Sequence, residues 1–236
     1  MKKIIWFVTI LVFGYSMAFQ TISKDTLKTR IFSISPSKKG IDKVNGLVFG
    51  LGLTFDKGVD FRIVNGINLE INPLSPLFMV FADPSRHGFY EVYSTTLNGI
   101  NISTGNYSST NCVAINGFST TWYNDSYSVN GISANGFYNY ATKLNGIHIS
   151  FASNYSKKAS GIFLSISNNS EKINGLQIGV FNDALVENGI QIGLYNKTDL
   201  FRGVQIGFFN KTKSVKGLQL GFWNSNAKRS LPFLNF

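Results

Sequence analysis

Apolar and polar residues alternate along most of this chain, and the alternation repeats with a fixed period. Near the C-terminus the segment Gly175-Leu-Gln-Ile-Gly-Val-Phe-Asn182 recurs three times at intervals of fourteen residues. Most of the chain is therefore one repeated unit. The three recurrences begin at Gly189, Gly203 and Gly217, and weaker copies begin at Gly46, Gly66, Gly99, Gly117, Gly131, Gly146 and Gly161.

Within each copy the apolar residues fall at every second position, as in Leu176, Ile178 and Val180. Side chains two residues apart share one face of an extended strand, so this alternation predicts β-strands and not helices. The segments between copies, such as Asn-Lys-Thr-Asp at 196–199, are rich in residues that form turns. Each copy is thus predicted to be a strand of about nine or ten residues and a turn of about four.

The repeated unit reads nearly the same in both directions, Asn-Gly-apolar-Gln-apolar-Gly-apolar-aromatic-Asn, and this symmetry favours antiparallel pairing. In such pairs each glycine would lie beside an aromatic ring that covers it. An open sheet of about twelve strands would leave two long edges, so closure is expected. We therefore predict an all-β protein, an up-and-down antiparallel β-barrel of about 12 strands, with apolar residues facing lipid and polar residues facing a narrow lumen.

A second architecture fits the same period. It is a β-solenoid with fourteen residues per coil and parallel strands, in which Asn182, Asn196, Asn210 and Asn224 stack as a ladder. Such coils resemble the β-roll heads of trimeric autotransporter adhesins. Segments such as 196–199 argue against it, because they carry no regular apolar positions for a second inward-facing strand.

The repeated motif and the ending Lys228-Arg-Ser-Leu-Pro-Phe-Leu-Asn-Phe236 resemble an uncharacterised family of bacterial surface-repeat proteins. The resemblance is strong over Gly161 to Phe236 and looser over Val44 to Ser160. It implies a signal-bearing, all-β protein of the bacterial envelope, with no established activity, cofactor or catalytic residue. The aromatic last residue also resembles the terminal signal of outer-membrane barrels, although Pro232 departs from that pattern.

The N-terminus has the three zones of a secretory signal peptide: two basic residues, an apolar run over 4–13, and a small-x-small site at 16–18. The protein is therefore expected to be exported, to the bacterial outer membrane or the cell surface. We predict a signal peptide at 1–18, a lead-in at 19–43, and one repetitive β domain at 44–236 with a proline-rich insertion at 72–87.

Composition and charge narrow the expected partners. Only 14% of the residues are charged, and 22 Lys plus Arg against 12 Asp plus Glu give a formal net charge of +10. The basic residues are scattered through the predicted turns, so we expect membrane lipid or lipopolysaccharide as partner and no nucleic acid. One cysteine, Cys112, and two histidines give no basis for a disulfide framework or a metal site.

His148 and Ser150 form the strongest candidate for a catalytic pair, because residues two apart on a strand share a face. Outer-membrane phospholipases resemble this chain in using a His-x-Ser pair on a strand. In other copies Gln, Asn, Gly or Ser fills the same positions, so we interpret the two residues as a polar pair facing the lumen. No nucleotide-binding loop, metalloprotease motif or serine-hydrolase elbow occurs in the sequence.

The sequence thus predicts a protein that is not an enzyme and assigns it no catalytic, cofactor-binding or metal-binding residue. The first functional hypothesis is an outer-membrane β-barrel that serves as an envelope scaffold or narrow passive pore. The alternative is a surface-exposed β-solenoid that acts in adhesion or binding. A His/Ser outer-membrane hydrolase comes third.

Overall fold

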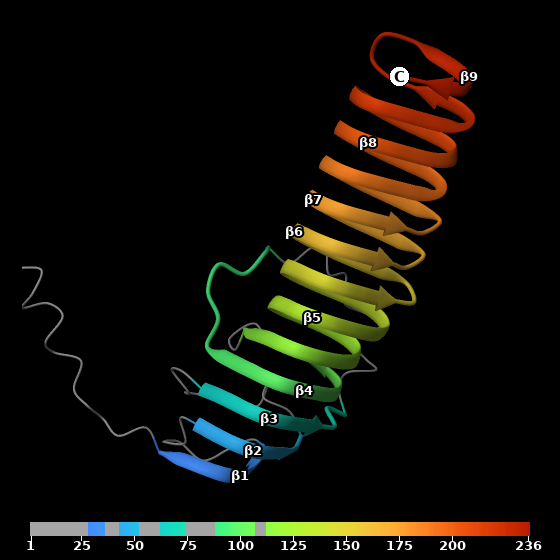
Figure 1. Cartoon of the computed structure of the whole chain (residues 1–236). Coiled ribbons are helices and arrows are strands. Elements are labelled where there is room, and N and C mark those ends of the chain that lie inside the picture. The colour runs from blue at the N-terminus through green and yellow to red at the C-terminus, as the bar shows by residue number, and fades with distance from the viewer. Residues whose placement is uncertain (1–27, 36–42, 52–61, 74–87, 107–111) are drawn as a thin grey trace, which may run out of the picture.

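In a computed structural model of the chain, one continuous sheet winds as a β-solenoid whose coils stack along a single axis (Figure 1). The structure describes residues 28–35, 43–51, 62–73, 88–106 and 112–236. Nine strands are found in these ranges: β1 (Thr29–Ser35), β2 (Lys43–Gly50), β3 (Arg62–Glu70), β4 (Thr95–Asn106), β5 (Val113–Ser150), β6 (Ser153–Leu164), β7 (Ser167–Ile178), β8 (Phe181–Ser225) and β9 (Ser230–Asn235).

Neighbouring strands from β1 to β8 pair in parallel and in register with the repeat. Between β7 and β8, for example, Gly175 lies opposite Gly189 and Gln177 opposite Gln191. The predicted up-and-down antiparallel barrel of about 12 strands is therefore wrong, and with it the lumen and the pore that depended on the barrel. The alternative architecture, a parallel β-solenoid, describes the fold, and from Gly117 to Gly217 the repeat glycines are fourteen or fifteen residues apart.

Each coil is a flattened turn with two walls (Figure 1). We define the first wall as the residue before each repeat glycine through the fifth residue after it, which is 188–194 in the coil of Gly189. The second wall is the remainder, 195–201 in that coil. Asn196 and Thr198 are buried on the second wall. The segments predicted to be turns thus belong to a second inward-facing strand, and in this coil the inward residues of the segment 196–199 are polar.

The centre of the apolar core is a column two residues before each repeat glycine, and Val48, Val113, Ala141 and Ala184 extend the core beside it. Stacked coils lie about 4.8 Å apart, so each member of the column covers the next. Glu187 occupies this column between Ile173 and Phe201, and all three side chains are buried. The apolar members in the earlier coils are Val44, Val64, Leu97, Ile115, Val129, Leu144, Ala159 and Ile173.

The repeat glycines form a second column of eleven residues, which explains why glycine recurs there. From Gly46 to Gly217 each has a φ between +124° and +154°, a region that other residues rarely adopt. A Cβ added to Gly203 would also collide with the carbonyl oxygen of Gly189 in the preceding coil. Any other residue at this position would therefore strain the backbone and separate the coils.

The C-terminal strand β9 closes the last coil. It pairs antiparallel with the end of β8, and Asn235 donates a hydrogen bond to Gln219 Oε1 at 2.8 Å. Arg229 donates to the carbonyl oxygen of Phe236 and lies 4.5 Å from the centre of its ring. Since β9 is an edge strand, it tolerates Pro232, which cannot donate to a ladder.

The predicted signal peptide at 1–18 lies outside the described residues, as does most of the insertion at 72–87. Part of the predicted lead-in, 29–35, forms β1. Just after the insertion, Phe89 stacks on Tyr140 with ring centres 5.2 Å apart. Tyr90 donates a hydrogen bond to Asp125 Oδ2 at 3.0 Å. The chain that follows the insertion therefore packs against β5.

Candidate functional site

The first wall carries three outward columns, at the first, third and fifth positions after each repeat glycine. Three positions in eleven copies give 33 residues, of which 30 are apolar and none is charged. The exceptions are Thr104, Thr120 and Gly136. All 33 are at least partly exposed, and Leu194 is 61% exposed. We call this surface the apolar face.

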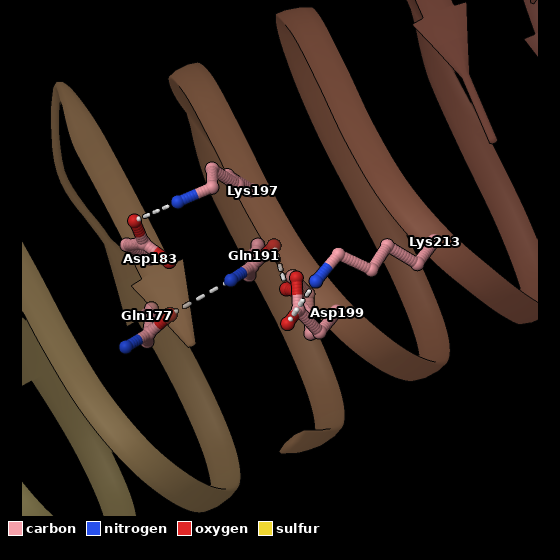
Figure 2. Close-up of polar contacts among 7 residues, drawn as sticks. Gln177, Asp183, Gln191, Lys197, Asp199 and Lys213 are labelled. Carbon is pink, nitrogen blue, oxygen red and sulfur yellow. Dashed lines mark hydrogen bonds and ion pairs between the residues drawn. The ribbon is translucent and has the colours of Figure 1, made fainter. Parts of the chain in front are cut away.

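The apolar side chains face outward because the residues between them are held inside by a glutamine ladder. Gln191 donates to Gln177 Oε1 at 2.9 Å, Gln205 to Gln191 at 2.6 Å and Gln219 to Gln205 at 2.7 Å. Figure 2 shows the first of these bonds joining neighbouring coils. With glutamine inside, the pleat of the strand places Ile190 and Ile192 outside.

A second amide ladder fills the interior where the two walls meet. Asn196 accepts a hydrogen bond from Asn182 at 2.8 Å and donates to Asn210 Oδ1 at 2.8 Å. It also donates to the carbonyl oxygen of Ile206 at 3.0 Å. The same pattern begins at Asn154 and runs through the C-terminal coils. Buried polar groups are tolerated here because each has a partner in the next coil.

Removing one member of this buried ladder is expected to destabilise the fold. Asn196→Ala removes one of the two bonds that the Asn182 amide donates and leaves Asn210 Oδ1 without this donor, and each buried group that loses a partner costs about 1–3 kcal/mol. We expect a loss of about 2–4 kcal/mol in the free energy of unfolding, measured by urea denaturation followed by circular dichroism. The control is Asn188→Ala, which removes an exposed ladder bond to Asn174 of 2.9 Å. Equal losses in the two variants would contradict the interpretation.

An open groove of about 810 Å³ runs along the apolar face across five coils. Its floor includes Gly179, Gly193 and Gly207, and apolar residues such as Ile192 and Leu194 form its two rims. No charged side chain lines it. A groove with so apolar a lining suits contact with hydrocarbon.

The two edges of the apolar face differ in chemistry in the C-terminal coils. On one edge, the residue before the repeat glycine changes from asparagine in most copies to Arg202 and then Lys216, both exposed. On the other edge, the sixth residue after the glycine is aromatic. This aromatic column consists of Phe181, Tyr195, Phe209 and Trp223.

The second wall is polar and carries paired charges outside. Lys197 lies 2.8 Å from Asp183, and Lys213 lies 2.7 Å from Asp199, each pair joining neighbouring coils (Figure 2). All four side chains are partly exposed, so each pair contributes little to stability. Their effect is to neutralise the acidic residues of this wall.

The candidate catalytic pair is buried, and among the described residues Ser150 Oγ has no hydrogen-bond partner. His148 is 0% exposed and Ser150 is 3% exposed. The hydrogen bond of His148 Nδ1, at 2.8 Å, is to Ser133 of the preceding coil, and its ring stacks on Phe163 at 5.3 Å. Burial lowers the pKa of His148 to about 4. These residues therefore serve as interior packing and offer no surface to a substrate.

The remaining predictions about chemistry concern metals and the cysteine. Among the described residues there is no group of three or more histidine, cysteine or acidic side chains that could hold a metal ion. Cys112 is buried, and burial and the carboxylate of Asp125 raise the pKa of its thiol far above the ordinary value. A thiol in this state is a poor nucleophile.

Sequence reasoning missed three buried acids, Glu70, Asp125 and Glu187. Burial raises the pKa of Glu187 to about 8, and the nearby Gln191 side chain lowers it by a smaller amount. Neither carboxyl oxygen of Glu187 has a hydrogen-bond partner of suitable geometry among the described residues. Burial likewise raises the pKa of Asp125 to about 7, against the effect of its bond from Tyr90. The sequence feature that could have revealed Glu187 is its position two residues before a repeat glycine, where the other copies have an apolar residue.

In the part of the chain that the structure describes, no helix has the length and apolar character needed to cross a membrane. Comparison of the chain with protein-family models, with curated proteins and with solved structures finds no match.

Proposed function

We propose that this chain is a non-enzymatic binding protein of the bacterial envelope, a β-solenoid that attaches to membrane lipid through its apolar face. The observation that carries the proposal is the run of 30 apolar and no charged residues at 33 outward positions. At about 4.8 Å per coil and 3.3 Å per residue, the face measures roughly 50 by 17 Å, or about 800 Å². Soluble monomers rarely expose patches larger than about 300–600 Å².

Lipid suits this face better than a soluble partner does. Interfaces between soluble proteins are only about 57% non-polar and carry hydrogen bonds throughout. The apolar face offers almost no side-chain donors or acceptors. Its backbone groups are paired with the coils before and after, as between β6, β7 and β8. Contact with hydrocarbon would therefore leave few polar groups without partners.

Vesicle flotation tests this function. The full chain is expected to float with phosphatidylcholine vesicles, and Ile192→Glu combined with Ile206→Glu is expected to lower the bound fraction at least about tenfold. A charged side chain costs more than the 1.4 kcal/mol that corresponds to that factor when it enters hydrocarbon. Both residues are exposed, so the fold should persist, which circular dichroism checks.

The matched control places the same charges on the second wall. Leu185 and Leu200 are 52% and 55% exposed there, and their change to glutamate should leave flotation unchanged. Equal losses in the two double variants would exclude the apolar face as the attachment surface. A chain that fails to float and forms a dimer, which Ile192→Glu with Ile206→Glu converts to a monomer, would show that a second copy covers the face.

A further inference from the structure

We infer that the lipid bound by the apolar face is anionic, and that its phosphate-bearing headgroups are recognised by Arg202 and Lys216. This inference rests on the proposed function and names its partner more closely. The observation behind it is that a basic edge, the apolar face and an aromatic edge lie side by side in the last coils.

The basic edge replaces a ladder of neutral amides. In the earlier coils the residue before each repeat glycine is mostly asparagine, and these side chains bond to one another, as Asn98 does to Asn65 at 2.8 Å. The ladder reaches Asn188, which donates to Asn174 at 2.9 Å. The next two coils have Arg202 and Lys216 instead. Both are exposed, and neither has an ion pair within the ranges that the structure describes.

These two cations lie directly beside hydrocarbon-facing residues. Arg202 is two residues before Val204, and Lys216 is two residues before Leu218, the first apolar column in each coil. When the apolar face rests in the acyl region, the long basic side chains reach the phosphate level above it. Arginine binds phosphate through its planar guanidinium group, and lysine binds it as a point charge. The geometry thus places the cations where headgroups lie.

The opposite edge of the apolar face has residues suited to the same depth in a membrane, the level of the lipid headgroups. Tyr195 and Trp223 follow the last apolar column in their coils, and Trp223 is 44% exposed. Tyrosine and tryptophan concentrate at membrane interfaces because their rings are amphipathic. The aromatic edge therefore marks the interfacial level on one side, and the basic edge marks it on the other.

The charge of the C-terminal third of the chain supports attraction to an anionic surface. Residues 153–236 contain ten Lys plus Arg and four Asp plus Glu, a difference of +6. Of the four acids, Asp183 and Asp199 are paired with lysines, and burial raises the pKa of Glu187 to about 8. Little negative charge thus remains to repel anionic headgroups from this end of the solenoid.

The test compares vesicles of phosphatidylcholine with vesicles of phosphatidylcholine and phosphatidylglycerol in equal parts. The full chain is expected to bind the anionic vesicles more tightly. Arg202→Gln with Lys216→Gln should lower that affinity roughly 25-fold, because each basic residue near an anionic surface contributes about a factor of five. Binding of this variant to phosphatidylcholine vesicles should fall much less, because the choline cation of that lipid offsets the charge of its phosphate.

The control removes the same charge from the second wall through Lys157→Gln with Lys172→Gln, both exposed positions. It should lower the affinity for anionic vesicles by less than about threefold, since charges far from the surface are screened. An equal loss in the control would overturn the basic edge as the recognition element. Equal binding of the full chain to both vesicle types would overturn the inference and leave the proposed function intact. Failure to bind either type would instead overturn the proposed function.

Discussion

A Gly203→Ala variant is expected to lose at least about 3 kcal/mol in its free energy of unfolding, because two costs add. The residue has a φ of +139°, where an L-amino acid is strained by roughly 1–3 kcal/mol. The new methyl group would also overlap the backbone carbonyl of Gly189, which cannot move without separating the coils. Urea denaturation followed by circular dichroism measures the loss.

The matched control for this substitution is Gly88→Ala. No atom lies within 4 Å of the Cβ that alanine would add there. We expect its stability to stay within about 0.5 kcal/mol of the original chain, as for most surface changes. Comparable losses at the two positions would mean that glycine is required for reasons other than the stacking of coils.

The second large effect concerns Glu187 and pH. Its carboxyl group has an ordinary pKa of 4.5, and burial raises the pKa to about 8 in the folded chain. Between these values the folded state binds more protons than the unfolded state, so stability falls as pH rises. The stability that the protonated carboxyl group of Glu187 contributes is fully present below pH 4.5 and is lost above pH 8. At about 1.4 kcal/mol per pH unit, the loss attributable to Glu187 approaches 5 kcal/mol as an upper limit.

Other buried titratable groups determine the pH range in which the effect of Glu187 can be measured. His148, whose pKa is lowered to about 4, stabilises the fold above pH 6.5 and loses that contribution as pH falls toward 4. Asp125, with a pKa of about 7, acts in the same direction as Glu187. The clearest window is therefore pH 6.5 to 8. Over that interval we expect Glu187→Gln to lose about 2 kcal/mol less stability than the original chain in urea titrations. Parallel curves for the two chains would contradict the buried-carboxyl account.

The sequence predicts much of the fold at the level of single strands. The alternation of Ile190, Gln191 and Ile192 correctly indicates strands with apolar residues outside and polar residues inside. It does not determine strand direction, because the repeated unit is nearly symmetric and places like residues together in either orientation. The decisive segment is 196–199. For a solenoid we expected the inward residues of this segment to be apolar, whereas Asn196 is buried with a bond to Asn210 of the next coil and Thr198 with a bond to Gln191 across its own coil.

The candidate site, like the fold, is only partly predictable from the sequence. The sequence shows the outward columns as an apolar pattern. Because antiparallel pairing was predicted, these residues were expected on the outside of a closed barrel and not on one face of a solenoid. The polar, inward placement of His148 and Ser150 was predicted, whereas the bond from Ser133 to His148 depends on which coil lies below. Glu187 was missed because its neighbours in the column, Ile173 and Phe201, are distant in sequence and are aligned only by the stacking.

The closing strand β9 also bears on how such a molecule grows over evolutionary time. Asn235 gives Gln219 the same amide contact that glutamine of a further coil would give. The terminus therefore imitates one more copy, and it ends the stack without requiring a specialised last unit. Duplication of a fourteen-residue stretch upstream would lengthen the molecule by one coil, and β9 could still pair with the last coil in the same way.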